Sequence, residues 1–304
     1  NVDLPHFSDN DHCDLYLYAE RLPFMDIVSS IQDLRVSLLG RRQAHRTGLV
    51  PTMGALHDGH LSLIAAAQRE ADRIAATIFV NPTQFAAGED FTSYPKTLDA
   101  DLEALEHAGC DVVFVPAVET MYPTGSATTV TVNGPLTQTL EGAHRPHFFG
   151  GVATVVTKLL AAAQADVAVF GEKDYQQLKV IERMAADLLL GTEIIGAPTV
   201  RAKDGLALSS RNTYLSPSER DIAPHLYRAL TSATDAIAAG ADPRLVTEQA
   251  TKDIQSAGFA SVDYLDYRAA KDLAQPQGAL PVGQGRLLAA AWLGTTRLID
   301  NVSA

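Results

Sequence analysis

Short hydrophobic runs alternate with amphipathic segments between about residue 48 and residue 200. The runs are rich in Val, Ile and Ala and predict strands at 48–52, 73–80, 110–116, 165–171 and 192–198. Apolar residues at helical spacing lie between them and predict helices at 61–71, 97–109, 151–164 and 173–189. Continuous hydrophobic strands that alternate with helices are typical of a parallel sheet covered on both faces.

The pattern changes after residue 200. The segment "SPSERDIAPHLYRALTSATDAIAAG" predicts a helix that begins with a capping box at Ser216 and Glu219 and ends at a glycine. A second helix is expected over 243–258, and strand-like segments follow at 260–268, 285–293 and 295–302. The sequence therefore predicts an α/β, Rossmann-like domain over residues 1–199 and a smaller α+β domain, with helices and a short antiparallel sheet, over 200–304.

Composition narrows the partners and the location. The formal net charge of −12 argues against a nucleic-acid backbone as the main partner, although one local basic site stays compatible with it. The sequence has no apolar run of about 18 residues, which argues against a membrane span. Cys13 and Cys110 lie far apart and suggest no disulfide framework, so we expect a cytoplasmic protein. The polar, acidic first 14 residues do not resemble a signal peptide and are expected to be disordered.

Polar side chains gather directly after three of the predicted strands. "MGALHDGH" follows the strand at 48–52, "NPTQF" follows the strand at 73–80, and "GEKDYQQ" follows the strand at 165–171. In parallel α/β sheets, ligands bind beyond the carboxyl ends of the strands. We therefore expect these three segments to share one site.

His57 and His60 lie in the predicted turn between a strand and a helix and allow three interpretations. A zinc-binding pair usually has four-residue spacing and a further ligand nearby, which this sequence does not offer. A polar turn with a helix cap would need only Asp58 and Gly59. A helix N-terminus attracts anions, so we favour phosphate handling, in which imidazole N–H groups and helix-end amides converge on one oxyanion.

Further segments carry groups suited to phosphate or to a neutral ligand. "GEKDYQQL" places Lys173 beside acidic residues at the start of a helix, where simple complementation of the helix dipole is an equal explanation. "LSSRN" combines two hydroxyls with Arg211 and suits either a phosphate clamp or a turn. Asn81 and Gln84 of "NPTQF" offer neutral amides, or an Asn–Pro turn. Together these segments indicate chemistry on a phosphorylated nucleotide, without a P-loop or a G-x-G-x-x-G motif.

These motifs resemble the pantothenate synthetase (pantoate–β-alanine ligase) family. Segments of this chain occur in the same order as the family's motifs between residues 48 and 215, namely "PTMGALHDGH", "IFVNPTQF", "YPKTLDAD", "LEGAHRP", "FGEKDYQQL" and "DGLALSSRN". The segment "GTTRLIDN" fits the family's C-terminal domain. The resemblance implies a nucleotidylyltransferase fold with an H-x-G-H signature and a C-terminal lid domain. It also implies that ATP and pantoate give pantoyl adenylate and pyrophosphate, after which β-alanine attacks and releases pantothenate and AMP.

The resemblance assigns roles position by position. The residues expected to act in catalysis are His57, His60, Lys173 and Arg211. The residues expected to contact ATP are Met53, His57, His60, Gly171, Lys173, Asp174, Ser209, Ser210 and Arg211. Pantoate is expected to contact Met53, Gln84 and Gln177, with Asn81 and Tyr94 at the border of the cleft. Asp101 is expected to contact Mg²⁺ through water, and the family implies a homodimer.

The sequence departs from the family pattern at "RPHFFGGV", where Phe148 takes the position of a histidine and His147 lies one place early. Leu208 stands where many relatives have Met, a change that conserves volume and that a pocket wall tolerates. Three other functions stay open. One is another H-x-G-H adenylyltransferase, which AMP release would exclude. The second is a non-catalytic nucleotide-binding protein on the same scaffold. The third is a zinc hydrolase, which metal analysis of the purified protein would test.

Overall fold

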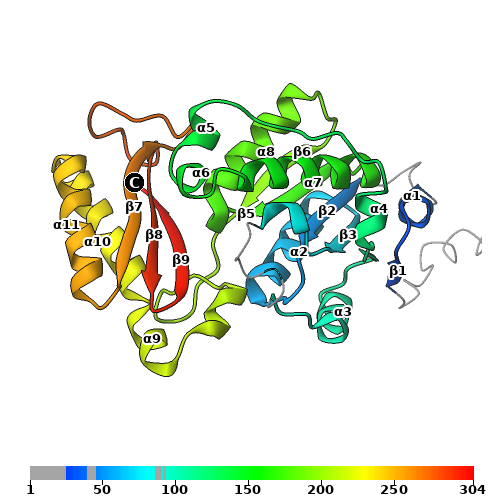
Figure 1. Cartoon of the computed structure of the whole chain (residues 1–304), viewed down its shortest axis with the longest axis horizontal. Coiled ribbons are helices and arrows are strands. Elements are labelled where there is room, and N and C mark those ends of the chain that lie inside the picture. Colours follow the sequence, from blue (N-terminus) through cyan, green and yellow to red (C-terminus); the bar gives the residue numbers. More distant parts are fainter. Residues whose placement is uncertain (1–24, 40–45, 86–90, 92–93) are drawn as a thin grey trace, which may run out of the picture.

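A computed structural model gives the structure of residues 25–39, 46–85, 91 and 94–304. It contains a six-stranded sheet and a three-stranded sheet that lie beside each other along the long axis of the molecule (Figure 1). The disorder expected for the first 14 residues falls outside the described residues. Among those that are described, no helix is long and apolar enough to cross a membrane.

The larger sheet is parallel and has the strand order β1-β4-β3-β2-β5-β6. Its strands are β1 (Asp26–Val28), β2 (Thr47–Thr52), β3 (Arg73–Ile78), β4 (Val112–Phe114), β5 (Val167–Gly171) and β6 (Glu193–Ala197). One face packs against α1 (Ile31–Leu39), α7 (Phe148–Ala163) and α8 (Tyr175–Asp187), and the other against α2 (Asp58–Glu70) and α3 (Leu98–His107). Successive side chains of a strand point to opposite faces, so Leu49 joins the first core and Val50 the second. The predicted parallel sheet covered on both faces is confirmed.

β2 and β5 are neighbours inside this sheet, but they pair over a short distance. Gly48 pairs with Val167 and Leu49 with Ala168, whereas β2 pairs with β3 along its whole length. Pro51 follows these pairs and has no N–H to donate to a ladder. The chain runs from β2 towards one edge of the sheet and from β5 towards the other, which is the switch point where such sheets open a crevice.

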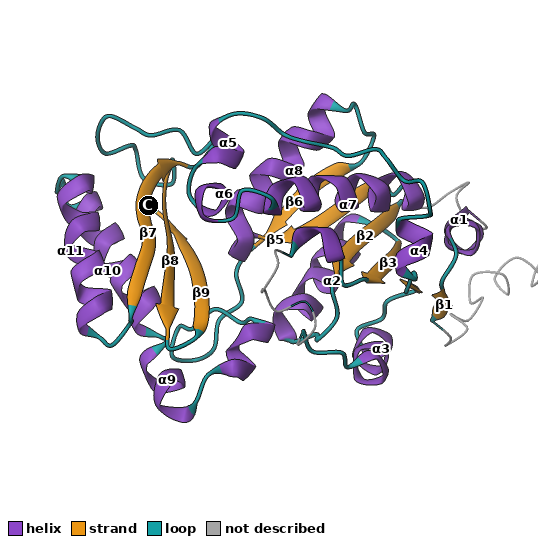
Figure 2. Cartoon of the chain, viewed as in Figure 1, coloured by secondary structure: helices purple, strands orange, loops and turns teal. Residues whose placement is uncertain are grey.

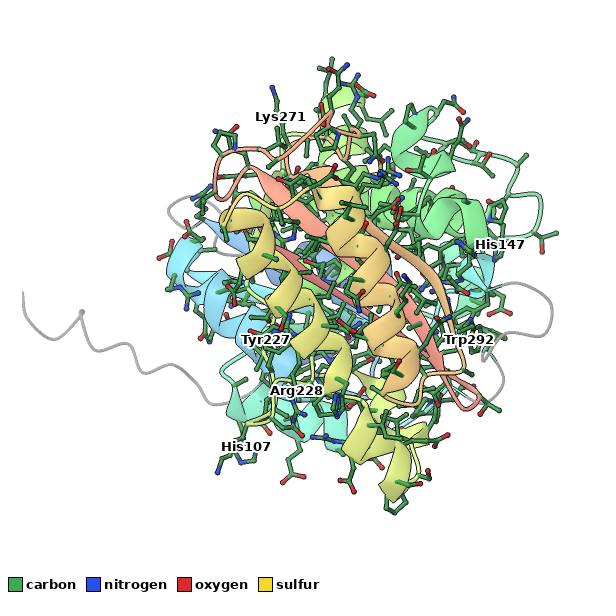
Figure 3. The ribbon with its side chains drawn as sticks, turned by 90° about the vertical axis from the view of Figure 1, so that its left-hand side faces the viewer. His107, His147, Tyr227, Arg228, Lys271 and Trp292 are labelled. Carbon is green, nitrogen blue, oxygen red and sulfur yellow. The ribbon has the colours of Figure 1, made fainter. Side chains whose placement is uncertain are left out.

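The smaller sheet is antiparallel, with the order β7-β8-β9, and consists of β7 (Ser261–Ala269), β8 (Gly285–Leu293) and β9 (Thr296–Ser303). Two helices, α10 (His225–Ala238) and α11 (Pro243–Ser256), lie across its outer face (Figures 2 and 3). Leu287 of β8 packs beneath them, while the next residue, Leu288, packs into the core around α7. The division of the chain at residue 200 stays a prediction, with β6 ending before it and the second core beginning after it.

Three features differ from the sequence-based prediction. The single helix expected over 216–240 is wrong, because α9 (Pro217–Ile222) ends before Pro224, whose ring cannot continue the helical hydrogen bonds. The capping box at Ser216 and Glu219 is confirmed. β1 and α1 precede the first predicted strand. The stretch before α7 contains helices too short for a periodic signal, namely α4 (Val118–Met121), α5 (Pro135–Gln138) and α6 (Glu141–His144).

Candidate active site

A cavity of about 1050 Å³ lies at the carboxyl ends of β2 and β5 and reaches the inner face of the antiparallel sheet. Pro51 and Gly171 line it from the parallel sheet, and Arg297 and Asn301 line it from β9. Every candidate residue from the sequence lines this cavity except Asp101. The structure therefore brings the candidates together, while their individual roles stay predictions.

The turn between β2 and α2 holds both histidines. His57 is the N-cap of α2, and its Nδ1 accepts a hydrogen bond from the Gly59 N–H at 3.1 Å. The His57 N–H donates to Nδ1 of His60 at 3.4 Å, and the two ring centroids lie 4.1 Å apart. Because each Nδ1 is an acceptor, each neutral ring carries its proton on Nε2. The helix cap and phosphate handling are thus compatible, since the capping bonds fix two Nε2–H donors at a helix N-terminus.

Both histidines have a lowered pKa. Burial, together with the neighbouring His57 and Lys173, lowers the pKa of His60 to about 3. Burial and then Lys173 lower the pKa of His57, against the opposing effect of Asp58 and Asp174. The rings are consequently neutral at pH 7 and act as hydrogen-bond donors rather than as cations.

Asp101 lies beneath this turn and outside the cavity. Its side chain is buried, and its carboxylate accepts hydrogen bonds from the Ala55 N–H at 2.9 Å, the Leu56 N–H at 2.8 Å and the Thr97 hydroxyl at 3.2 Å. Ala55 has a φ of 51°, in the left-handed region that few residues with a side chain adopt. The geometry indicates that Asp101 holds the turn that carries the histidines, and its predicted contact to Mg²⁺ stays a prediction.

Asn81, which follows β3, anchors another part of the cavity wall. The Asn81 side chain is buried, and its Oδ1 accepts hydrogen bonds from the Tyr122 hydroxyl at 2.7 Å and the Thr83 hydroxyl at 3.0 Å. These bonds fix the start of η1 (Pro82–Gln84), at whose end Nε2 of Gln84 lies 2.9 Å from Sδ of Met53. Met53 and Gln84 are therefore adjacent and present no charge to the cavity.

The cationic and hydroxyl candidates come from two short turns. Lys173 lies in η2 (Glu172–Asp174), between β5 and α8, with its Nζ 3.8 Å from Oδ1 of Asp174. Ser209 caps η3 (Ser210–Tyr214), and its Oγ accepts a hydrogen bond from the Arg211 N–H at 3.3 Å. The Tyr94 hydroxyl lies 3.3 Å from Oγ of Ser210. Lys173, Arg211 and these hydroxyls thus face the same cavity from different parts of the chain.

The sequence analysis missed a buried charge network on the cavity wall. Glu141 of α6 accepts two hydrogen bonds from Nη1 of Arg297 on β9, at 2.8 and 2.9 Å, and one from the Tyr264 hydroxyl at 3.2 Å. Asp263 accepts a hydrogen bond from Nε of Arg297 at 2.7 Å. Glu141 and Arg297 belong to the motifs "LEGAHRP" and "GTTRLIDN", and the available signal was Asp263, a charge between Val262 and Tyr264 in a predicted strand.

The departure from the family pattern falls at the start of α7. Phe148 lines the cavity, and the Arg145 guanidinium stacks over its ring, 4.0 Å from the centroid. His147 is exposed and does not line the cavity (Figure 3). The chain therefore presents an apolar ring to the cavity at this position.

The carboxyl edge of a parallel sheet, two neutral imidazoles at a helix N-terminus, and a lysine and an arginine all meet at one cavity. These features are typical of an α/β enzyme that acts on a nucleotide. Residues 26–303 match the family model of pantoate-beta-alanine ligase. A pantothenate synthetase of Caulobacter vibrioides is 53% identical over 280 residues, which cover 91% of this chain and 98% of that protein.

Solved structures agree with this match. Pantothenate synthetase from Thermus thermophilus is 45% identical and has a TM-score of 0.83, with 91% of this chain and 99% of that chain covered. Pantoate-beta-alanine ligase from Francisella tularensis, complexed with beta-gamma ATP and beta-alanine, is 35% identical and has a TM-score of 0.78, with 92% and 98% covered. The chain belongs to the pantoate–β-alanine ligase family and is an ATP-dependent ligase.

Proposed function

We propose that the chain joins pantoate to β-alanine in two steps within this cavity, by way of pantoyl adenylate. The observation that carries the proposal is the composition of the cavity wall. Imidazole and cationic groups line it together with the uncharged, adjacent pair Met53 and Gln84. An acid seated against Met53 and Gln84 would share this cavity with the phosphates of ATP and could present its carboxylate to them.

The first step needs little acid–base chemistry. A carboxyl group with a pKa of about 4 is ionised at neutral pH, so a carboxylate oxygen attacks the α-phosphorus directly and pyrophosphate leaves. The main obstacle is repulsion between the carboxylate and the triphosphate. Lys173 and Arg211 would offset that repulsion, while the neutral His57 and His60 would donate N–H groups to phosphate oxygens.

Magnesium is expected to accompany ATP. Among the described residues, no three His, Cys, Asp or Glu side chains form a group that could hold a metal ion. Mg²⁺ is commonly held by one or two carboxylates together with substrate phosphates, and it then neutralises phosphate charge. The Asp174 carboxylate is partly exposed at the cavity and fits such a role.

The second step transfers the pantoyl group to an amine. The neutral amine of β-alanine attacks the acyl carbon, the bond to the adenylate oxygen breaks, and AMP leaves. A free amine of this type has a pKa of about 10 and is mostly protonated at neutral pH. No side chain is assigned as its base, and we expect proximity within the cavity to supply most of the rate enhancement.

The test is exchange of labelled pyrophosphate into ATP, with Mg²⁺ and without β-alanine. We expect exchange that requires pantoate, and a loss of about 100-fold in His60→Ala. His107→Ala is the matched control and should exchange normally, because His107 is exposed at the end of α3 and does not line the cavity (Figure 3). Exchange without pantoate would overturn the proposed acid. Folded protein without exchange would favour a non-catalytic role, and failure to release AMP in the full reaction would favour another adenylyltransferase.

A homodimer and a cytoplasmic location complete the proposal. The dimer follows from the family resemblance, and sedimentation should show a species of twice the 32.5 kDa chain mass. The cytoplasmic location rests on the cysteine content of the sequence, with Cys110 a buried free thiol in the structure.

A further inference from the structure

The turn η2, which carries Lys173, is in direct contact with the last strand of the C-terminal sheet. Nδ2 of Asn301 on β9 donates hydrogen bonds to the backbone carbonyls of Glu172 at 2.9 Å and Lys173 at 2.8 Å. Asn301 is 3% exposed, so both bonds are shielded from water. One amide group therefore uses both of its donors on consecutive residues of a turn more than a hundred positions away in the sequence.

Arg286 of β8 holds Asn301 in this orientation. Its Nε donates to Oδ1 of Asn301 at 2.7 Å, which leaves the amide nitrogen to face the turn. Its Nη2 donates to Oε2 of Glu172 at 3.0 Å, and its guanidinium stacks on the ring of Tyr175, 3.7 Å from the centroid. Arg286 thus contacts the residues on both sides of Lys173 and Asp174.

We propose that Asn301, held by Arg286, is a positioning residue that fixes the backbone of Lys173 for the adenylation step. The inference rests on the proposed role of Lys173 in handling the phosphates of ATP. A displacement of about 1 Å at a group that contacts the reacting atoms can lower a rate by about 100-fold. Two shielded hydrogen bonds to the turn restrict such a displacement. The C-terminal sheet would in this way act on the first step through the backbone of the N-terminal domain.

Asn301→Asp separates the two halves of this contact. The substituted side chain keeps an acceptor for Arg286 and replaces the donor to the Glu172 and Lys173 carbonyls with an oxygen that they repel. We expect a fall of about 10-fold to 100-fold in the turnover of pantoate-dependent pyrophosphate exchange. The KM for pantoate should not change, and the affinity for ATP should weaken while the affinity for adenosine stays the same.

A double-mutant cycle with Lys173→Ala distinguishes positioning from a general loss of stability. If Asn301 acts through Lys173, Asn301→Asp should cost less than about 2-fold in the Lys173→Ala background, because coupled residues are not additive. Equal losses in both backgrounds would overturn the inference. An active Lys173→Ala variant would instead refute the proposed role of Lys173 itself, so the two failures are distinguishable.

Two further variants keep the test sharp. Asp266→Asn alters a residue of β7 in the same sheet, whose partner is Arg268 at 2.6 Å and which does not line the cavity, so its effect should be additive with Lys173→Ala. If Asn301→Asp does not fold, Glu172→Gln serves in its place. The Glu172 side chain is partly exposed, so the substitution should be tolerated, and it weakens the hold on Arg286 by removing the charge of its partner. Its loss of turnover should likewise vanish in the Lys173→Ala background, and an additive loss would count against positioning.

Discussion

Asp101 offers a direct test of how the histidine turn is held. Asp101→Asn keeps one side-chain oxygen, which still accepts one of the two backbone N–H groups. The amide nitrogen takes the place of the other oxygen, and because it is itself a donor it cannot accept the second N–H. The variant therefore loses one of the two backbone hydrogen bonds to the carboxylate, at 2.8 and 2.9 Å, leaves one N–H of Ala55 or Leu56 unpaired, and keeps the other bond without charge assistance. A hydrogen bond to a charged group contributes about 1.5–3 kcal/mol, and an unpaired buried donor costs about 1–3 kcal/mol. Since these terms overlap, we expect a loss of about 2–4 kcal/mol of unfolding free energy.

Urea unfolding followed by circular dichroism would measure this loss. The single tryptophan, Trp292, lies on β8, so its fluorescence would report the antiparallel sheet separately. Adenylation should slow because the turn that positions His57 loosens, and the Mg²⁺ concentration for half-maximal rate should not change. Asp99→Asn is the control, because Asp99 is exposed in the first turn of the same helix and should cost less than about 1 kcal/mol. Unchanged stability with a tenfold higher Mg²⁺ requirement would refute this reasoning and establish the metal contact.

Three other variants test the remaining parts of the site. His57→Asn preserves a capping side chain, so it should lose less than about 0.5 kcal/mol of unfolding free energy while the rate of adenylation falls about 100-fold. A normal rate would exclude phosphate handling by His57. The folded pKa of His60, about 3, lies below its unfolded value, so the unfolding free energy present at neutral pH is lost as the pH falls from about 6.5 towards 3. In urea titrations at several pH values, His60→Gln should lower the slope of unfolding free energy against pH by up to about 1.4 kcal/mol per pH unit. An unchanged slope would contradict the neutral ring. Gly151→Ala would place a Cβ 2.3 Å from the carbonyl oxygen of Thr83 in η1 and should raise the KM for pantoate. In the control Gly150→Ala, the added Cβ meets nothing within 4 Å, so the KM should not change. Equal KM values in the two variants would show that η1 does not shape the acid site.

The sequence predicts the parts of this fold that depend on local pattern. Buried strands such as β5 are continuous hydrophobic runs, and their polar successors, including Lys173, follow from the geometry of parallel sheets. The interruption at Pro224 was also readable from one residue, since proline ends a helical pattern more often than it continues one.

The rest could not be read from local pattern because it depends on contacts between distant segments. Glu141 and Arg297 are 156 positions apart, and nothing in either motif indicates that they pair. Asp101 looks like any acidic residue in a first helical turn until the structure places it beneath Ala55 and Leu56. Burial converts each of these side chains from a surface charge into a structural support.

The opening of the cavity is formed by the backbone, because β2 and β5 pair over only part of their length. The last paired residues are Leu49 and Ala168, and Pro51 brings no N–H with which to close the gap. Exchanging a wall side chain such as Gln84 would therefore be expected to reshape the proposed acid-binding wall without closing the opening or moving the turn that carries Lys173. For protein engineering, this separation suits the scaffold to altered acid selectivity, since the preference for a substrate and the machinery of activation can be varied one at a time.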